Sequence, residues 1–428
     1  MDIKIIHNYF LQCKSISIDT RKIESESFFV AIKGENFDAN TFAKEALEKG
    51  ASFVIIDNPD YYIDDRTIVV KDSLEALQEL AQFHRSYLNI PIIALTGSNG
   101  KTTTKELIQV VLSKKFKTKA TIGNLNNHIG VPLTLLSFDK ETEIGIVEMG
   151  ANHQKEIEFL CEIAQPDFGY ITNFGKAHLE GFGGVEGVIK GKCELYNYLS
   201  KHNKLAFVNL DDSIQVEKSV GIKCYTFGIN KLNTDVVVTA VTASPFVEVT
   251  YSNCTIVSHL IGLYNSNNIN AAITIGTYFN VPIADIKAAI EGFVPENNRS
   301  QLLNINSNEI ILDAYNANPS SMTVAIENFI QLKKTNKIAI LGDMFELGVE
   351  SLEEHKTIVN LLLNENGIAV YLIGKDFYSN KAEQSNFHFY ETFELFSEAF
   401  KKDKVENSII LIKGSRGMAL ERTLALIS

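Results

Sequence analysis

Short apolar runs, each about the length of a β-strand, alternate with amphipathic stretches along most of this chain. In the middle of the sequence the strand-like runs are Ile92–Leu95, Ile144–Met149, Phe168–Thr172 and Leu205–Val208. Helix-like patterns separate these runs, and such alternation is typical of a parallel α/β sheet. Val236–Val241 and Phe246–Tyr251 alternate apolar and polar positions as antiparallel strands do, so we expect a hairpin extension of the sheet.

Similar patterns occur on both sides of this middle part. Residues 1–88 hold strand-like Ser27–Ile32 and Ser52–Ile56, a turn at Lys33–Glu35, and helix-like Phe42–Lys49 and Leu74–Tyr87. Residues 295–428 hold strand-like Glu309–Leu312, Lys337–Leu341, Ala369–Ile373 and Ser408–Ile412. We therefore predict an α/β fold with three domains: a small N-terminal α/β domain (1–88), a central parallel-sheet domain (89–294) and a C-terminal Rossmann-like α/β domain (295–428). Asn89-Ile90-Pro91 is a plausible hinge between the first two.

Composition limits the class of protein. A chain of 428 residues is too long for one typical core, and 45% hydrophobic with 21% charged residues is ordinary for a globular protein. The net charge of −12 argues against a general nucleic-acid binder. Five scattered cysteines without CxxC spacing, no signal-like N-terminus and no membrane-length apolar run lead us to expect a cytoplasmic enzyme without membrane insertion.

Residues 96–103, Thr-Gly-Ser-Asn-Gly-Lys-Thr-Thr, lie between a strand-like run and a helix-like run. This is the layout of a phosphate-binding loop, in which backbone N–H groups point at an anion. Lys101 would supply a mobile positive charge, and Thr102 could offer its hydroxyl to Mg²⁺. Gly97 and Gly100 are separated by two residues where the common P-loop has four. An ordinary strand-to-helix turn is the competing interpretation, and the Gly-Lys-Thr sequence argues against it.

Three further residues could contribute chemistry. Glu148 ends an apolar run, where a carboxylate can either hold a magnesium ion or simply face solvent. His178 follows another strand-like run and could bind metal, although a lone histidine is more often structural. Lys192 is by default a solvated helix lysine. It would become a magnesium ligand only if carbon dioxide converted it to a carbamate.

Polar loops follow several strand-like runs. Asn124–Pro132 is rich in asparagine, and Asn265 and Asn268 share one helix face at i, i+3 spacing. Three loops of the last domain also carry polar residues: 313–322, 341–348 and 413–416. Three such loops at one sheet edge favour a binding cleft. No GxGxxG follows these strands, so a dinucleotide site is poorly supported.

Together these motifs resemble the Mur ligase family, the ATP-dependent amide-forming enzymes of peptidoglycan synthesis, over nearly the whole chain. Residues 96–103 match the family's shortened P-loop, and Lys192 falls where its carbamylated lysine lies. Glu148-Met-Gly150 and Ala177-His-Leu-Glu180 match its magnesium-ligand segments. Resemblance to the members that add D-alanyl-D-alanine is carried by Asp19-Thr-Arg21, Phe29-Val-Ala-Ile-Lys-Gly-Glu35, Asn124–Pro132, Tyr315-Asn-Ala-Asn-Pro319, Leu341-Gly-Asp-Met344 and Lys413-Gly-Ser-Arg416.

This resemblance implies that residues 1–88 are a UDP-sugar substrate domain and residues 89–294 a P-loop ATPase domain. It also implies a set of site residues. The implied catalytic residues are Lys101, Lys192, His178 and Arg299. The implied nucleotide-binding residues are Gly97, Ser98, Asn99, Gly100, Lys101, Thr102, Thr103, Asn265, Asn268, Arg299 and Asp313. The implied magnesium ligands are Thr102, Glu148, His178 and Lys192, and the implied substrate-binding residues are Thr20, Arg21, Lys33, Gly34, Asn126, Asn127, Asn316, Asn318, Lys413 and Arg416.

The resemblance also implies cofactors and substrates: ATP, two Mg²⁺ ions, a carbamylated Lys192, UDP-N-acetylmuramoyl-tripeptide and D-alanyl-D-alanine. We expect a monomer. The sequence departs from the family at Tyr264, where histidine is usual, and at Ala39-Asn40, where glycine and histidine are common. Two alternatives stay open: another amino-acid ligase of the family or a folylpolyglutamate-type synthase, and a P-loop ATPase that acts as a switch module.

Overall fold

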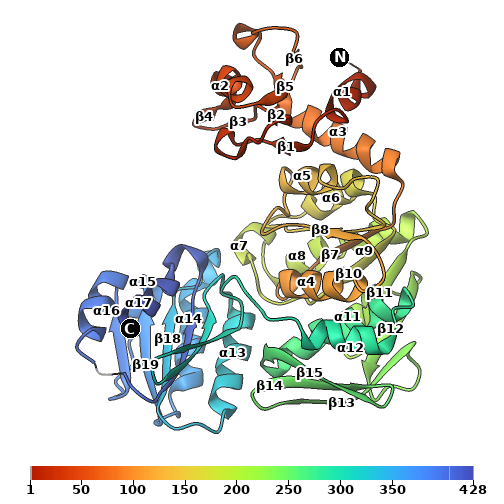
Figure 1. The fold of residues 1–428 in the computed structure, drawn as a ribbon. Helices are drawn as coiled ribbons and strands as arrows, with labels where there is room; N and C mark the ends of the chain where they lie inside the picture. Colours follow the sequence, from red (N-terminus) through yellow and green to blue (C-terminus); the bar gives the residue numbers. More distant parts are fainter. Residues whose placement is uncertain (1, 404, 428) are drawn as a thin grey trace.

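The computed structural model describes residues 2–403 and 405–427, and within them the strands form three large sheets and one short hairpin (Figure 1). Each large sheet comes from one consecutive part of the chain. The N-terminal unit is drawn in red and orange at the top, the C-terminal unit in blue at the lower left, and the central unit lies beside both. The predicted α/β class is confirmed, and the boundaries at 88/89 and 294/295 stay predictions. None of the described helices is both long and apolar enough to span a bilayer.

The N-terminal unit is a four-stranded parallel sheet covered by helices. Its elements are α1 (Ile3–Phe10), β1 (Ser15–Ser17), β2 (Ser27–Val30), α2 (Ala43–Glu48), β5 (Ala51–Ile56), β6 (Thr67–Val69) and α3 (Ser73–Leu88), with strand order β1-β2-β5-β6. Lys33–Glu35, predicted as a turn, is a turn only at Glu35. Lys33–Gly34 forms β3, which pairs antiparallel with β4 (Phe37–Asp38) across that turn. Asp72 caps the start of α3, and Asn89 ends it in the left-handed conformation (φ 48°), just before the expected hinge.

Two buried histidines join α1 to α3. His7 Nε2 lies 3.0 Å from His84 Nδ1, and His84 Nε2 lies 2.9 Å from the carbonyl oxygen of Phe138. That carbonyl only accepts, so His84 donates from Nε2 and accepts at Nδ1 from His7. Both rings are neutral in this chain of hydrogen bonds. Burial and the neighbouring His84 lower the pKa of His7 to about 4, and burial lowers the pKa of His84.

We expect the free energy of unfolding to decrease as pH falls from 6.5 toward 4. The unfolded chain protonates His7 near pH 6.5, whereas the folded protein resists protonation down to about 4. The expected loss is about 1–3 kcal/mol. Urea unfolding of the parent and of His7→Gln, which keeps a donor, measures it: the variant should lose part of the pH dependence. Exposed His202→Gln is the control, and an equal pH dependence in all three proteins would contradict the assignment.

The central unit carries a nine-stranded sheet in the order β15-β14-β13-β12-β11-β10-β7-β9-β8. Its strands are β7 (Ile92–Thr96), β8 (Thr118–Ala120), β9 (Ile144–Glu148), β10 (Phe168–Ile171), β11 (Leu205–Asn209), β12 (Lys223–Ile229), β13 (Val236–Ala243), β14 (Phe246–Tyr251) and β15 (Cys254–Ile261). The pairs β13–β14 and β14–β15 are antiparallel, so the predicted hairpin extension is confirmed. The remaining pairs are parallel.

Helices cover both faces of the central sheet, and this is why strands such as β7 are buried at every position and apolar at all but the last, Thr96. The helices are α4 (Lys101–Leu112), α5 (Gly130–Leu136), α6 (Glu156–Ala164), α7 (Leu179–Phe182), α8 (Val185–Lys192), α9 (Glu194–Lys201), α10 (Ser213–Lys218), α11 (Ser266–Tyr278) and α12 (Ile283–Glu291). Strands β10, β7 and β9 are neighbours, so their carboxyl ends open at one edge of the sheet. That edge is where ligands bind in open α/β folds.

The C-terminal unit has a six-stranded sheet in the order β16-β17-β21-β18-β19-β20. Its elements are β16 (Gln301–Ile305), β17 (Asn308–Asp313), α13 (Pro319–Gln331), β18 (Lys337–Gly342), α14 (Ser351–Leu362), β19 (Ile368–Ile373), α15 (Lys375–Ser379), β20 (Phe387–Tyr390), α16 (Phe393–Phe400), β21 (Ile409–Lys413) and α17 (Leu424–Ile427). Only β16 is antiparallel to its neighbour within this described sheet. Asp313 pairs with Lys413 in register, so two polar loops begin side by side.

Most strands that the sequence patterns did not predict lie at sheet edges, namely β1, β6, β8, β15, β16 and β20. An edge strand packs on fewer neighbours and keeps more polar residues, so its apolar run is short or interrupted. The exception is β12, which lies inside the central sheet between β11 and β13 but has a mostly half-buried pattern.

Candidate active site

A cleft of about 1150 Å³ runs between the three units. The predicted catalytic, nucleotide and metal residues that line it are Ser98, Asn99, Gly100, Lys101, Thr102, Thr103, Glu148, His178, Asn265, Asn268, Arg299 and Asp313. The predicted substrate residues that line it are Asn126, Asn127, Asn316, Asn318, Lys413 and Arg416. Residues far apart in the sequence therefore meet in one place, and the cleft combines a phosphate-type loop with cationic and amide groups from another unit.

The loop between β7 and α4 has the tight conformation that a phosphate site requires. Gly97 (φ 143°) and Gly100 (φ 78°) adopt backbone angles that L-residues rarely adopt. A Cβ at Gly97 would lie 2.0 Å from Thr172 Oγ1, so only glycine fits against β10. Gly100 precedes α4, which places the positive end of the helix and its free N–H groups at the loop. Lys101 Nζ donates to Gly97 O at 2.8 Å and to Ser98 O at 3.3 Å.

Asn265 and Asn268 line the cleft and are also hydrogen-bonded within the protein. Asn268 Nδ2 donates to Asn265 Oδ1 at 2.8 Å, and its Oδ1 accepts from Thr104 Oγ1 at 3.0 Å. A Cβ at Gly100 would lie 2.6 Å from Asn268 Oδ1, so the asparagine packs directly on the loop. Tyr264, which departs from the family pattern, pairs its hydroxyl with Ser300 Oγ at 2.9 Å and also lines the cleft.

Glu148 provides a carboxylate in the cleft, one of whose oxygens has no hydrogen-bond partner among the described residues. Its side chain is 2% exposed, which contradicts the alternative of a solvent-facing acid. Oε1 accepts from Asn126 Nδ2 at 2.8 Å, whereas Oε2 has no hydrogen-bond partner among the described residues. A buried carboxylate oxygen without a partner is energetically costly unless a cation binds it. Glu148 and the Thr102 hydroxyl line the same cleft, and this donor set fits a magnesium ion.

Lys192 is buried, so its default interpretation as a solvated lysine is wrong. The side chain is 1% exposed, and Nζ donates to Ala151 O at 3.2 Å and lies 4.9 Å from the ring centroid of Phe182. Burial and, second, the charge of Lys101 lower the pKa of Lys192 well below its usual value. Neither Lys192 nor Gly97 is among the described residues that line the cleft, although Ala151 is.

His178 contacts the C-terminal unit. It precedes α7 in the left-handed conformation, with φ 54°, and its Nδ1 forms a short hydrogen bond with Glu346 Oε2. Burial lowers the pKa of His178, and the Glu346 carboxylate opposes that shift. Glu346 lies within the motif 341–348 but was not predicted as a site residue. The motif marked the loop, and the sequence carried no signal that this side chain would reach a histidine in another unit.

The C-terminal unit supplies cations and amides to the same cleft. Lys413 Nζ lies 2.5 Å from Asp313 Oδ2, and the Arg299 guanidinium lies 3.7 Å from the ring centroid of Tyr315. Asn318 Nδ2 donates to Asn99 Oδ1 at 2.7 Å, which joins this unit directly to the glycine loop. Arg299 also lies close enough to Lys101 for its charge to contribute to the lowered pKa of that lysine.

The residues predicted in the N-terminal unit do not line this cleft in the described structure: they are Thr20, Arg21, Lys33 and Gly34. Arg21 pairs with Asp19 at 2.8 Å on the surface, and Lys33 Nζ lies 3.0 Å from Asp57 Oδ1. Asn40, one of the departures, donates to Asp57 Oδ1 at 2.8 Å and to Asp38 Oδ1 at 2.6 Å. In this chain Asn40 thus fixes the hairpin that carries Lys33.

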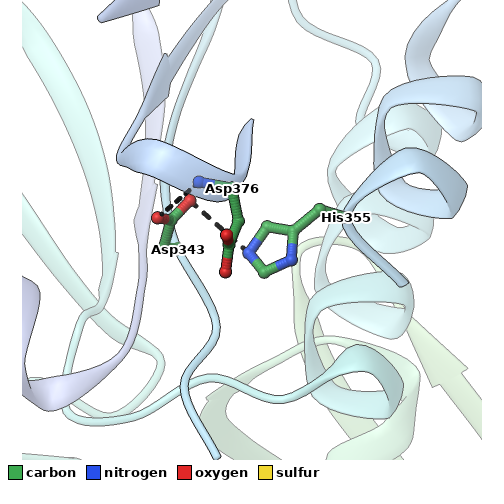
Figure 2. A group of neighbouring side chains, drawn as sticks. All are labelled: Asp343, His355 and Asp376. Atoms are coloured by element: carbon green, nitrogen blue, oxygen red, sulfur yellow. Dashed lines mark hydrogen bonds and ion pairs between the residues drawn. The ribbon is translucent and has the colours of Figure 1, made fainter. Parts of the chain in front are cut away.

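Asp343, His355 and Asp376 gather in the C-terminal unit like a set of metal ligands (Figure 2). Their hydrogen bonds account for them without a metal ion. The Asp343 carboxylate accepts the backbone N–H groups of Asp376 and Phe377, both at 3.0 Å. His355 Nε2 accepts from Met344 N at 3.0 Å, and Nδ1 donates to Ser351 O at 2.7 Å. These bonds fix the loop after β18.

Family models match three parts of the chain. They are described as Mur ligase family, catalytic domain (residues 12–85), Mur ligase middle domain (95–276) and Mur ligase, glutamate ligase domain (298–416). The UDP-N-acetylmuramoyl-tripeptide–D-alanyl-D-alanine ligase of Bacillus subtilis is 35% identical over 95% of this chain and 91% of that protein. The Escherichia coli protein of the same name is 34% identical over 95% of this chain and 92% of its own length.

Solved structures agree with the family models. A MurF crystal structure from Acinetobacter baumannii superposes with a TM-score of 0.86 at 29% identity, covering 99% of this chain and 98% of that one. MurF from Thermotoga maritima, solved in complex with ADP, superposes with a TM-score of 0.84 at 27% identity, covering 98% and 97%. With a relative that is 35% identical over nearly its whole length, the chain belongs to the Mur ligase family.

Proposed function

We propose that this protein joins D-alanyl-D-alanine to UDP-N-acetylmuramoyl-tripeptide and converts ATP to ADP and phosphate, a step of peptidoglycan synthesis. The observation that carries the proposal is the single cleft in which the glycine loop meets Arg299 and Lys413 of the C-terminal unit. Curated relatives that align with 95% of the chain carry the name of this activity. The ADP complex of the Thermotoga maritima relative supports a nucleotide at this cleft.

The proposed chemistry follows from the weakness of a carboxylate as an acylating agent. The terminal carboxylate of the tripeptide attacks the γ-phosphorus of ATP, and ADP leaves with the electron pair of the broken P–O bond. The amine of D-alanyl-D-alanine then attacks the acyl carbon of the acyl phosphate, loses a proton, and phosphate departs. Two anions must meet in the first step, so the main catalytic demand is charge neutralisation and alignment. Lys101 and Arg299 bring positive charge to the same cleft.

Magnesium fits the residues present. Thr102 and Glu148 would hold one ion, and His178 with Lys192 would hold a second. When bound, the ions would neutralise phosphate charge and polarise the reacting oxygens. Support for the first position comes from the unpartnered Glu148 Oε2. The Mur ligase fold and the matched sequence motifs motivate the second.

Lys192 can form a carbamate only from its neutral amine, because the protonated amine has no free electron pair. Its nitrogen attacks carbon dioxide, a C–N bond forms as one C=O π bond opens, and one proton is released, which leaves an anionic oxygen pair in place of the neutral amine. Burial and the nearby Lys101 favour the neutral amine, because they lower the pKa of Lys192.

The remaining assignments rest on the resemblance. Asn265, Asn268 and Asp313 would bind the nucleoside end of ATP. Thr20, Arg21, Lys33 and Gly34 would bind the UDP-sugar on the N-terminal unit. The residues that would contact substrates from the cleft are Asn126, Asn127, Asn316, Asn318, Lys413 and Arg416. A monomeric state and a cytoplasmic location complete the proposal.

A product assay tests this function. We expect the protein, given ATP, Mg²⁺, UDP-N-acetylmuramoyl-tripeptide and D-alanyl-D-alanine, to form the UDP-linked pentapeptide together with ADP and not AMP. Mass spectrometry identifies both products. Matched reactions with free D-alanine, with a single L-amino acid and with the UDP-linked dipeptide distinguish the other ligases of the family. ATP hydrolysis without any amide product would reject the proposal in favour of a switch-type ATPase.

A further inference from the structure

A loop of the C-terminal unit docks on His178. This loop consists of residues 343–348, directly after β18, and is called the 343–348 loop. Glu346 Oε2 forms the short hydrogen bond with His178 Nδ1, and Glu180 N donates to Glu346 O at 3.4 Å. Figure 1 shows α7, which begins right after His178, on the side of the central unit that faces the blue C-terminal unit.

The loop is held in a fixed shape for this contact. Met344 N donates to Nε2 of His355, one of the residues drawn in Figure 2, at 3.0 Å, and Phe345 N donates to Ser415 Oγ at 2.9 Å. Glu346 has φ 62° and His178 has φ 54°, so both members of the pair adopt left-handed backbone conformations that are unusual for their residue types. Such conformations persist only where the surrounding structure imposes them.

Gly348 allows the loop to approach so closely. Its φ is 57°, and a Cβ at this position would lie 3.2 Å from both Cβ and Cγ of Glu180. A side chain here would push the loop away from α7. Side-chain hydrogen bond, backbone hydrogen bond and close packing thus all occur at one point of contact between two units.

The partner decides which nitrogen of His178 carries the proton. An ionised carboxylate only accepts hydrogen bonds, so the proton lies on Nδ1, between the ring and Glu346. Nε2 then keeps its lone pair, which is the form in which histidine binds a metal ion. A carboxylate that holds the other ring nitrogen of a metal-binding histidine fixes its tautomer and orientation.

We propose that Glu346 is a positioning residue that orients His178 for the second magnesium ion, and that it does so only when the C-terminal unit is docked. Docking of the C-terminal unit on the central unit and orientation of the His178 ring are thereby coupled through the Glu346 side chain. This inference rests on the proposed function for its catalytic consequence. The geometry of the His178–Glu346 pair itself is independent of that function.

Glu346→Ala, Glu346→Gln and a matched control test the proposal. The control is Glu354→Ala, because Glu354 also joins the two units through Lys176 Nζ at 2.5 Å and is not one of the proposed metal ligands. The side chain of Glu346 is 54% exposed, so its replacement leaves the core intact.

Product formation is measured against Mg²⁺ concentration at saturating substrates. We expect Glu346→Ala to need about 10-fold more Mg²⁺ for half-maximal rate. The amide oxygen of Glu346→Gln still accepts from Nδ1, so this variant should need nearly the Mg²⁺ concentration of the parent. Glu354→Ala should change the Mg²⁺ requirement little.

The second readout needs no turnover. In the ligand-free protein labelled with ¹⁵N-histidine, we expect the His178 ring, assigned with His178→Gln, to show the Nδ1-protonated form. Glu346→Ala, and also Gly348→Ala, should shift this signal toward a mixture of tautomers. An unchanged signal in Glu346→Ala overturns the positioning role, and so does a Mg²⁺ requirement that rises equally in Glu354→Ala. Failure of the parent protein to form any amide would reject the proposed function while leaving the spectroscopic test valid.

Discussion

Lys192→Ala should lose roughly 100- to 1000-fold in the rate of amide formation, because the second magnesium position loses an anionic ligand whose contribution is about 3–4 kcal/mol. The lysine is 1% exposed and sits behind Ala151 at the wall of the cleft, in surroundings that favour the neutral amine. Acetate or formate added to the variant should restore part of the rate by replacing the missing oxygen pair. The measurement is the initial rate of pentapeptide formation, with circular dichroism to check the fold.

Lys190→Ala is the matched control. Lys190 lies on the same helix, α8, two residues away, but its side chain is exposed. We expect it to keep the parent rate. Removal of dissolved carbon dioxide should slow the parent protein and leave Lys192→Ala unaffected. A Lys192→Ala protein with normal turnover would exclude the carbamate from the mechanism.

Lys101→Ala should slow the reaction by about 10- to 150-fold, because one charged hydrogen bond to the phosphates contributes about 1.5–3 kcal/mol. The lysine begins α4 and bends back over the loop to Gly97 O and Ser98 O, so its charge lies at the positive end of the helix. Burial lowers its pKa, and the Glu148 carboxylate opposes that shift. Lys101→Ala should lower mainly kcat, because the negative charge that Lys101 faces increases during phosphoryl transfer.

Lys114→Ala provides the comparison for this second variant. Lys114 is exposed just after the end of α4, so it tests the loss of one positive charge from the same segment. Nucleotide affinity measured by calorimetry and kcat measured under saturation separate binding from chemistry. Near-normal kcat in Lys101→Ala would remove this residue from the mechanism.

Much of the fold could be predicted from the sequence because parallel strands covered on both faces are nearly continuous apolar runs. Strands β7, β9 and β18 were predicted to within about one residue for this reason. Edge strands such as β8 and β20 were not predicted, since an edge strand is only partly buried and its hydrophobic pattern is weak. The glycine loop was recognisable because its backbone angles at Gly97 and Gly100 leave few other residues possible.

Single site residues were less predictable when their environment came from distant parts of the chain. Lys192 looked like a solvated lysine, and only the packing of α8 under Ala151 and Phe182 buries it. Glu148 was equally consistent with solvent exposure until β9 was placed inside the sheet. Glu346 carried no individual signal at all, because its partner His178 is 168 residues earlier.

The sequence by itself determined the α/β class, the phosphate-type loop and the resemblance to the Mur ligase family, because these depend on local patterns and short motifs. Only the tertiary structure decided which polar loops share one cleft, which carboxylate oxygen lacks a partner, and that the C-terminal unit places Glu346 on His178. The physical reason is that burial and electrostatic pairing depend on side chains brought together from different units, and no local pattern records that approach.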